Sequence, residues 1–357
     1  MNSYSISGIQ QIGIGVSSLD ESWSCYRTLF GVDCRIFEDS AVAELMLPHT
    51  GGEARERHAV LAVNLQGGGG FEVWQYTGGK PQPPSFTLSP GDIGIYACKI
   101  KVKDIDSATS YIGSKGGTIL SGPSGGPDGA PVSYIADPFG NIFQLRVSDS
   151  WLLNEKRETG GVYGAVIGVS DIDNAVKFYG DILGYDNIIY DQRGRFSDLA
   201  PLPGGGSLLR RVLLAKSQPS SGAFSPLFGP SEVELIRSEE REPEKIFGGR
   251  YWGDLGFMHL CFDVSGMDAL RSRCSVMGFP FSVDSSDSRK GTSFDMGEAA
   301  GHFAYISDPD GTLIEFVETH KIPVIKRLGW YLDLRKRGRD KPLPLYFFRA
   351  MRFSKVR

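Results

Sequence analysis

Apolar residues follow two spacings along this chain, one typical of β-strands and one typical of amphipathic helices. Gln11–Val16 is a short, mostly apolar run of strand length, and Trp23, Tyr26 and Phe30 follow it with helical spacing. The same order recurs three more times. The four strand-forming runs are Gln11–Val16, Ala97–Val102, Gly164–Val169 and His259–Val264. The pattern therefore predicts four copies of one unit, here called modules one to four.

Each predicted helix is framed by the same two signals. An acidic residue four positions after the strand is the predicted N-cap, and a glycine further along is the predicted left-handed C-terminal cap. The acidic residues are Asp20, Asp106, Asp173 and Asp268, and the glycines are Gly31, Gly116, Gly184 and Gly278. Each module closes with a last strand, and these are Phe71–Tyr76, Ile142–Val147, Val233–Ile236 and Leu313–Val317.

A turn signal separates the modules into two kinds. Asp137-Pro138-Phe139-Gly140 precedes the last strand of module two, and Asp308-Pro309-Asp310-Gly311 precedes that of module four. Proline followed by glycine favours a tight turn. Modules one and three lack this signal, so modules one and two form a pair that is repeated as modules three and four.

The length and the loops predict where the parts of the chain divide. A chain of 357 residues forms two domains or one large duplicated domain. The predicted parts are 1–156 (modules at about 6–78 and 92–148), 157–319 (modules at about 160–238 and 255–319) and a tail at 320–357.

Charge distinguishes the tail from the body. Residues 320–357 contain twelve Lys or Arg and two Asp, whereas the whole chain has a net charge of −4, so the body carries about −14. From Ile322 onward the tail has partial helical stripes and predicts one or two short basic helices. We expect these to dock on the acidic body, and we expect no nucleic-acid partner.

The sequence indicates a cytoplasmic protein. The N-terminus shows no basic region followed by an apolar run, and no apolar run reaches the roughly 18 residues that span a bilayer. The five cysteines are odd in number and unpaired in spacing, which predicts free thiols.

Two polar residues interrupt strand-forming runs in module four. His259 and Glu315 each lie in an apolar segment where a strand should line a buried face. A buried imidazole and a buried carboxylate each need a partner, and one metal ion can serve both. The competing interpretation of His259 is a hydrogen-bonded core histidine.

The four modules, with Asp-Pro-x-Gly before the last strand of the second and fourth, resemble the vicinal oxygen chelate superfamily over residues 6 to about 319. Glyoxalase I, extradiol dioxygenases, methylmalonyl-CoA epimerase and bleomycin-resistance proteins belong to it. The resemblance implies an α+β fold of four βαβββ modules that form two cupped mixed sheets. It leaves the reaction open, because the superfamily hosts many.

The resemblance also implies a set of metal ligands. In the family they come from the first and last strands of two paired modules. Pairing modules one and four collects Gln11, Glu72, His259 and Glu315. Pairing two and three collects only Ala97, Gln144, Gly164 and Glu234. We favour the outer pairing over pairing neighbours, one with two and three with four, because its ligand set is complete and similar to that of some glyoxalase I enzymes.

This ligand set implies a metal-dependent lyase, isomerase or epimerase that acts through a metal-bound enediolate of a small oxygenated substrate. Glu315 would be the base, with Glu72 facing it across one divalent ion (Zn, Ni, Mn, Co or Fe). An Fe(II)-dependent ring-cleaving dioxygenase is the alternative, although Gln11 stands where such an enzyme would carry its first histidine. A protein that binds a metabolite or drug without turnover is a third. A monomer or a homodimer is expected.

The strand pattern leaves the orientation of four residues open. Gln10 and Gln11 point to opposite faces of a regular strand, so a shift of one residue exchanges them. His302 and Tyr305 are candidate cavity contacts. Because three positions separate them, a regular strand directs only one of the two inward.

Overall fold

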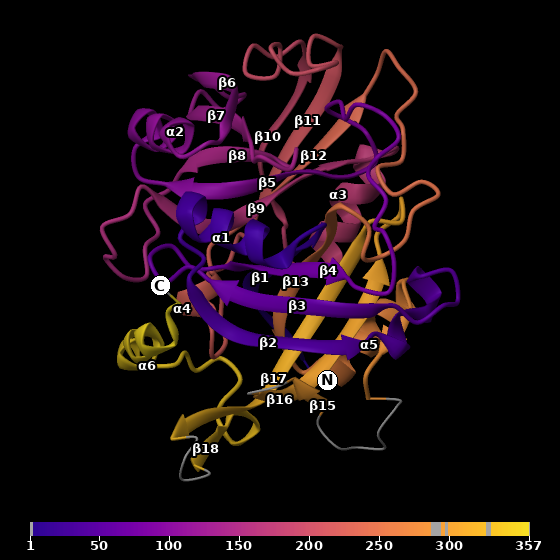
Figure 1. Ribbon diagram of the computed structural model, residues 1–357. Helices are drawn as coiled ribbons and strands as arrows, with labels where there is room; N and C mark the ends of the chain where they lie inside the picture. The colour runs from indigo at the N-terminus through magenta and orange to yellow at the C-terminus, as the bar shows by residue number, and fades with distance from the viewer. Residues whose placement is uncertain (1–2, 287–293, 297–298, 326–329, 357) are drawn as a thin grey trace.

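The strands form two mixed sheets, shown in the upper and lower halves of Figure 1. The computed structural model of the chain describes residues 3–286, 294–296, 299–325 and 330–356. Within these residues, a ten-stranded sheet (the first sheet) holds the strands of modules one and four together with one strand of the C-terminal tail, and an eight-stranded sheet (the second sheet) holds those of modules two and three. The predicted α+β architecture is confirmed.

The bounds of the elements follow the four modules. Module one contains β1 (Ser5–Val16), α1 (Leu19–Phe30), β2 (Cys34–Val42), the 3-10 helix η1 (Glu44–His49), β3 (Glu56–Val63) and β4 (Gly70–Tyr76). Module two contains β5 (Gly94–Val102), α2 (Ile105–Ser114), β6 (Thr118–Gly125), β7 (Pro131–Ala136) and β8 (Ile142–Val147). Module three contains β9 (Thr159–Gly168), α3 (Ile172–Asp181), β10 (Asn187–Gly194), β11 (Leu209–Ala215), α4 (Ser225–Phe228) and β12 (Glu232–Ser238).

Module four contains β13 (Gly256–Ser265), α5 (Met267–Val276), β14 (Val283–Asp284), β15 (Phe294–Met296), β16 (Ala299–Ser307) and β17 (Leu313–Ile325). The chain continues through β18 (Trp330–Asp333), η3 (Leu334–Lys336), α6 (Leu345–Ala350) and η4 (Met351–Ser354).

The first strands of the modules meet at the centre of each sheet. β1 pairs antiparallel with β13, and β5 pairs antiparallel with β9. On its other side, each of these strands runs parallel to the last strand of its own module. The first sheet therefore has the order β14-β16-β17-β13-β1-β4-β3-β2, with β15 paired to β16 and β18 paired to β17 beside this path. Module one shares it with module four as predicted.

The helices of the modules lie against the core faces of the sheets. The largest apolar cluster joins residues of both sheets with residues of α1, α2, α3 and α5, such as Tyr26, Ala108, Phe178 and Leu270. The opposite face of the first sheet is left to line a cavity. None of the helices in the described part of the chain has the length and apolarity that a membrane crossing requires.

Modules that are neighbours in sequence are joined by a repeated side-chain contact. The hydroxyl of Tyr26 in α1 donates to Asp137 at 2.8 Å, and that of Tyr179 in α3 donates to Asp308 at 3.1 Å. The other carboxylate oxygen of each aspartate accepts two backbone N–H groups, one from the Asp-Pro-x-Gly turn and one from the residue after it. Each turn is thereby fixed to the helix of the preceding module.

The helices begin one residue before the predicted N-caps. Ser18, Asp104 and Asp171 are the caps of the first three, and their side chains accept backbone N–H groups of the first turn. The prediction of Asp20, Asp106, Asp173 and Asp268 as caps is therefore wrong. These acids lie within the first turn instead, where a negative charge favours the positive end of the helix dipole. The four predicted capping glycines all have positive φ, as predicted.

The C-terminal tail is part strand and part helix. β17 continues to Ile325 and pairs with β18, so the prediction of helix from Ile322 is wrong at its start. Further on, α6 buries Phe348 completely. Lys355 and Arg352 contact Glu155 at 2.6 and 2.7 Å, so this part of the tail docks on the body as predicted.

Candidate metal centre

The four predicted ligand residues meet at the middle of the first sheet. Gly13 of β1 lies opposite His259 on one side and Glu72 on the other, and Cys261 lies between Gln11 and Glu315. Four adjacent strands therefore place one side chain each at the same point. We call this set the central cluster, and its members are Gln11 (β1), Glu72 (β4), His259 (β13) and Glu315 (β17).

The donor atoms of the central cluster are spaced like ligands of one ion. His259 Nε2 lies 3.1 Å from Glu315 Oε2 and 3.3 Å from Glu72 Oε2. Gln11 Nε2 lies 3.2 Å from Glu315 Oε2 and 3.5 Å from Glu72 Oε2. Ligands that bind one ion at about 2.1 Å are separated by about 3.0–3.4 Å. The four side chains already have the spacing of a shared coordination shell.

One buried oxygen of the cluster lacks a hydrogen bond. Among the residues that the structure describes, Gln11 Oε1 has no hydrogen-bond partner, whereas His259 Nε2 is in ion-pair contact with Glu315 and Glu72. Turning over the Gln11 amide exchanges its oxygen and nitrogen and directs Oε1 at the carboxylates. The set then offers one nitrogen and three oxygen donors, two of them anionic. These residues fit a divalent cation, and Mn, Fe, Co, Ni and Zn all accept such ligands.

Trp252 sets the tautomer of His259 in the absence of an ion. Its indole N–H donates to His259 Nδ1 at 3.3 Å. An indole can only donate, so Nδ1 accepts and the ring proton lies on Nε2, facing the two carboxylates. A cation at Nε2 therefore requires the ring proton to move to Nδ1, and the hydrogen bond from Trp252 must then open.

The carboxylates favour the charged imidazolium. Burial alone would lower the pKa of His259, but Glu315 and Glu72 outweigh it and raise the pKa to about 9. The N–H of Trp252 opposes protonation of Nδ1, yet one neutral hydrogen bond is weaker than two buried charge contacts at 3.1 and 3.3 Å. The same contact with His259 lowers the pKa of Glu315, although burial alone would raise it.

Uptake of a divalent cation is expected to strengthen as the pH rises. His259 is protonated at pH 7 and loses its proton as the pH rises through about 9, so a cation must displace one proton below that value. The apparent affinity for Zn²⁺ should rise about tenfold per pH unit between pH 7 and 9. In the metal-free protein, the stability of the fold changes with pH in the opposite direction, because protonated His259 stabilises the folded state. This contribution to the free energy of unfolding is complete below the ordinary pKa of 6.5 and is lost as the pH rises through about 9.

Competition with a chromogenic chelator at pH 7, 8 and 9 measures this slope. His58→Gln, which changes a partly exposed histidine of β3, should leave it unchanged. An affinity that stays constant from pH 7 to 9 would contradict a site at His259.

A cavity of about 580 Å³ opens onto the central cluster. Its polar end is formed by Gln11, Glu72 and Glu315. Its walls are mainly apolar and include Ile36, Phe37, Leu45, Met46, Phe303 and Val317. The cavity can hold a small molecule whose oxygens face the cluster and whose apolar part contacts the walls.

Of the two candidate cavity contacts, Tyr305 lines the cavity and His302 lies elsewhere. The Tyr305 ring lies 5.5 Å from the His259 ring, at 90°, and its side chain helps to lower the pKa of Glu315. His302 groups with Glu318 and His320. Both Gln10 and Gln11 line the cavity because β1 has a register shift between Ile9 and Gln11.

The equivalent place in the second sheet contains its own cations. Lys99 lies opposite Gly164, as Cys261 lies opposite Gln11 in the first sheet. Its ammonium lies 3.0 Å from Glu234 Oε2, and Arg211 lies 2.6 Å from Glu234 Oε1. These two groups neutralise the buried carboxylate that a metal would need. The second sheet therefore carries a salt-bridge network where the first carries the central cluster.

Sequence reasoning missed Gly13 and Trp252. A β-carbon built on Gly13 would lie 2.2 Å from His259 Cε1, so a strand glycine leaves room for the imidazole. A glycine within an apolar strand signals such a close approach. Trp252 lies in a loop, and its contact with His259 gives no periodic signal.

Two family models match the chain. Both describe the glyoxalase/bleomycin resistance protein/dioxygenase superfamily, and they match residues 8–145 and 165–296. No curated protein matches the sequence.

Solved structures share the fold. A mutant of glyoxalase I from Zea mays is similar with a TM-score of 0.53 and 15% identity, covering 87% of this chain and 93% of that one. The glyoxalase I of Zea mays is similar with a TM-score of 0.50 and 15% identity, covering 88% of this chain and 92% of that one. A candidate dioxygenase from Bacillus subtilis gives a TM-score of 0.58 and 10% identity, covering 99% of this chain and 97% of that one.

Proposed function

Because the chain belongs to the glyoxalase/bleomycin resistance protein/dioxygenase superfamily, we propose that it is a metal-dependent lyase, isomerase or epimerase of the glyoxalase type. Its substrate would be a small molecule with oxygens on neighbouring carbons. One observation carries this proposal: four buried polar side chains from four strands converge, with contacts of 3.1–3.5 Å, at the end of a cavity.

A divalent cation held by the central cluster would polarise two neighbouring substrate oxygens and stabilise the negative charge that forms when the adjacent carbon loses a proton. Gln11, Glu72 and Glu315 would orient the substrate with its oxygens toward the cluster, while apolar walls such as Phe303 and Val317 would contact its carbon skeleton. The protein would supply position and a proton acceptor.

Glu72 and Glu315 would carry the proton. They come from strands on opposite sides of the β1–β13 pair, so one can remove a proton from a carbon and the other can return it to the next. Glu315 is held by His259, Tyr305 and Cys261 as well as by Gln11. Glu72 contacts only His259 and Gln11 among the cluster residues, so it would be freer than Glu315 to accept a proton, whereas the family resemblance favoured Glu315 as the base.

Substitution of either carboxylate is expected to stop proton transfer. Glu72→Gln and Glu315→Gln keep the size and one oxygen of the side chain but remove the base. Loss of a positioned base costs about 10²- to 10⁴-fold in rate. Uptake of solvent deuterium by the hemithioacetal of methylglyoxal and glutathione, and by other small hydroxycarbonyl probes, measures the step by NMR.

Glu44→Gln is the matched control, because Glu44 also lines the cavity but lies outside the central cluster. Deuterium uptake that persists in both variants would rule out their role as bases. Oxygen consumption with a catechol or hydroquinone and Fe(II) would assign the site to ring cleavage. Tight binding of a probe by metal-free protein without turnover would assign it to sequestration.

A further inference from the structure

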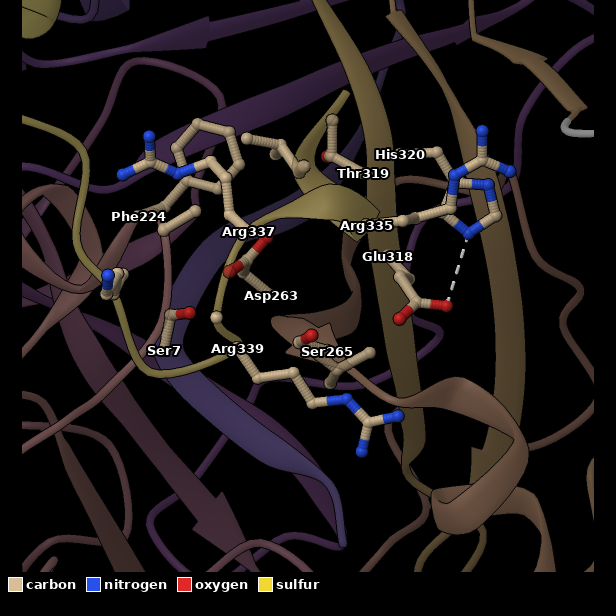
Figure 2. Close-up of a pocket in the computed structure, with 15 residues that line it drawn as sticks. Ser7, Phe224, Asp263, Ser265, Glu318, Thr319, His320, Arg335, Arg337 and Arg339 are labelled. Atoms are coloured by element: carbon tan, nitrogen blue, oxygen red, sulfur yellow. Dashed lines mark hydrogen bonds and ion pairs between the residues drawn. The ribbon is translucent and has the colours of Figure 1, made fainter. Parts of the chain in front are cut away.

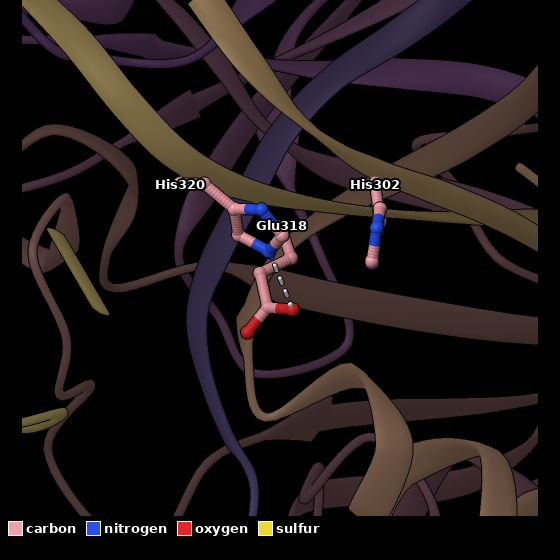
Figure 3. A group of neighbouring side chains, drawn as sticks. All are labelled: His302, Glu318 and His320. Atoms are coloured by element: carbon pink, nitrogen blue, oxygen red, sulfur yellow. Dashed lines mark hydrogen bonds and ion pairs between the residues drawn. The ribbon is translucent and has the colours of Figure 1, made fainter. Parts of the chain in front are cut away.

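A second group of metal-ligating side chains lies on the β16–β17 pair. We call it the edge cluster, and it consists of His302 from β16 with Glu318 and His320 from β17 (Figure 3). In the register of this pair, Tyr305 lies opposite Glu315 and His302 lies opposite Glu318. Three positions separate the two pairs on each strand, so they point to opposite faces of the sheet. The edge cluster is therefore separate from the cavity and the central cluster.

The ligand atoms of the edge cluster are close enough to share an ion. They all lie within 4.8 Å of one another. His320 Nε2 is 3.3 Å from Glu318 Oε2, and the rings of His302 and His320 lie 4.6 Å apart at 67°. Ligands of a tetrahedral ion with bonds of about 2.1 Å are about 3.4 Å apart. Small side-chain rotations would bring the three atoms to that spacing.

Backbone features aim two of these side chains. The β16–β17 register shifts between Ala300 and Gly301, so β17 has an extra residue at the position of His320. Such a bulge redirects a side chain. Glu318 Oε1 accepts the backbone N–H of Gly266 at 2.6 Å, which fixes the carboxylate and leaves Oε2 on the side of His320. An outer hydrogen bond of this kind commonly orients a metal ligand.

A pocket of about 140 Å³ gives access to the edge cluster (Figure 2). Glu318 and His320 line it, and Asp263 adds another buried carboxyl group. Four cationic side chains also line it: Arg335, Arg337, Arg339 and Lys341. The guanidinium of Arg335 donates two hydrogen bonds to Asp333, which offsets its charge. The remaining positive charges favour a small anion as a further ligand of an ion held by the edge cluster.

We propose that the edge cluster binds a second divalent cation, of the zinc type, that ties β16 to β17. Two imidazole nitrogens and one carboxylate suit zinc and similar transition metals, whereas calcium and magnesium prefer oxygen ligands alone. Three protein ligands leave a fourth position open to the pocket. Because the same two strands hold Tyr305 and Glu315 in register, an ion here restrains one wall of the central cluster.

Zinc stoichiometry of the full-length protein tests this proposal. Metal-stripped wild type and three variants are titrated with Zn²⁺ against a chromogenic chelator. The edge variant carries His302→Gln and His320→Gln, the central variant carries Glu72→Gln and Glu315→Gln, and the control carries His58→Gln. Wild type and control are expected to bind two equivalents. The edge and central variants are each expected to bind one equivalent, because the Zn²⁺ affinity of the altered site falls about tenfold or more.

The outcomes separate this proposal from the proposed function. One equivalent in wild type that the edge variant retains would overturn the edge site and leave the central site standing. One equivalent that the central variant retains would support the edge site and count against the metal-dependent function. If circular dichroism shows that the edge variant is unfolded, His302→Ala alone replaces it, and two equivalents of unchanged affinity in that protein would overturn the proposal.

Discussion

Gly13→Ala is expected to abolish divalent-cation binding at the central cluster. The new β-carbon would lie 2.2 Å from Cε1 and 2.5 Å from Nε2 of His259. β1 cannot move away, because it is hydrogen-bonded to β13 on one side and to β4 on the other. The imidazole must therefore leave its position among the carboxylates. Loss of a correctly placed ligand should weaken Zn²⁺ affinity by about 100-fold or more.

Zinc titration of Gly13→Ala at pH 8, with circular dichroism to show that the fold is kept, measures this effect. Gly194→Ala is the matched control, because a β-carbon at this β10 glycine would meet no atom within 4 Å. Equal Zn²⁺ affinity of the two variants would show that His259 does not need its present position, and the central cluster would lose its imidazole ligand.

Arg211→Leu is expected to destabilise the second sheet by about 3–5 kcal/mol, the usual cost of removing one partner of a buried ion pair. Arg211 is fully buried and contacts Asp198 at 2.8 Å and Glu234 at 2.6 Å. Glu234 would keep Lys99 at 3.0 Å, whereas Asp198 would lose its guanidinium partner. Burial already raises the pKa of Asp198 against the opposing effect of Arg211, so the variant should regain stability as the pH falls and this carboxyl group becomes protonated.

Urea unfolding of Arg211→Leu and Arg210→Leu at pH 7 and pH 5 tests this account. Arg210 is the adjacent residue, but it is partly exposed and pairs with Asp191 and Asp173 at the surface, so its loss should cost about 1 kcal/mol or less. Similar costs for the two substitutions would show that the buried network is not what stabilises the second sheet.

The module structure could be predicted because its signals are local. Strand length, helical spacing and capping glycines such as Gly31 and Gly184 each depend on a few neighbouring residues. The helix starts were misplaced because an acidic residue in the first turn and a capping residue are both common at a helix start. The side chain of Asp104 accepts the backbone N–H of Ser107 and thereby caps its helix. Only the three-dimensional structure distinguishes this capping residue from Asp106, which lies in the first turn.

The candidate ligands could be selected from the sequence, but the contacts around them could not. His259 and Glu315 stood out because charged or polar residues in apolar strands need partners. Gly13 and Trp252 touch the His259 ring from β1 and from a loop. The edge cluster depends on a register shift opposite His320, which no alternation of residues predicts.

The sequence by itself determined that this chain builds four similar modules, and it singled out His259 and Glu315 as polar residues within apolar strands. Hydrophobic periodicity encodes that much, because each element forms from neighbours in the chain, whereas Gln11 and Glu72 were added by the family resemblance. Only the tertiary structure decided that Gln11, Glu72, His259 and Glu315 converge while Glu234 is neutralised by Lys99 and Arg211. That outcome depends on strand order and register between distant segments, and on which charges are buried together.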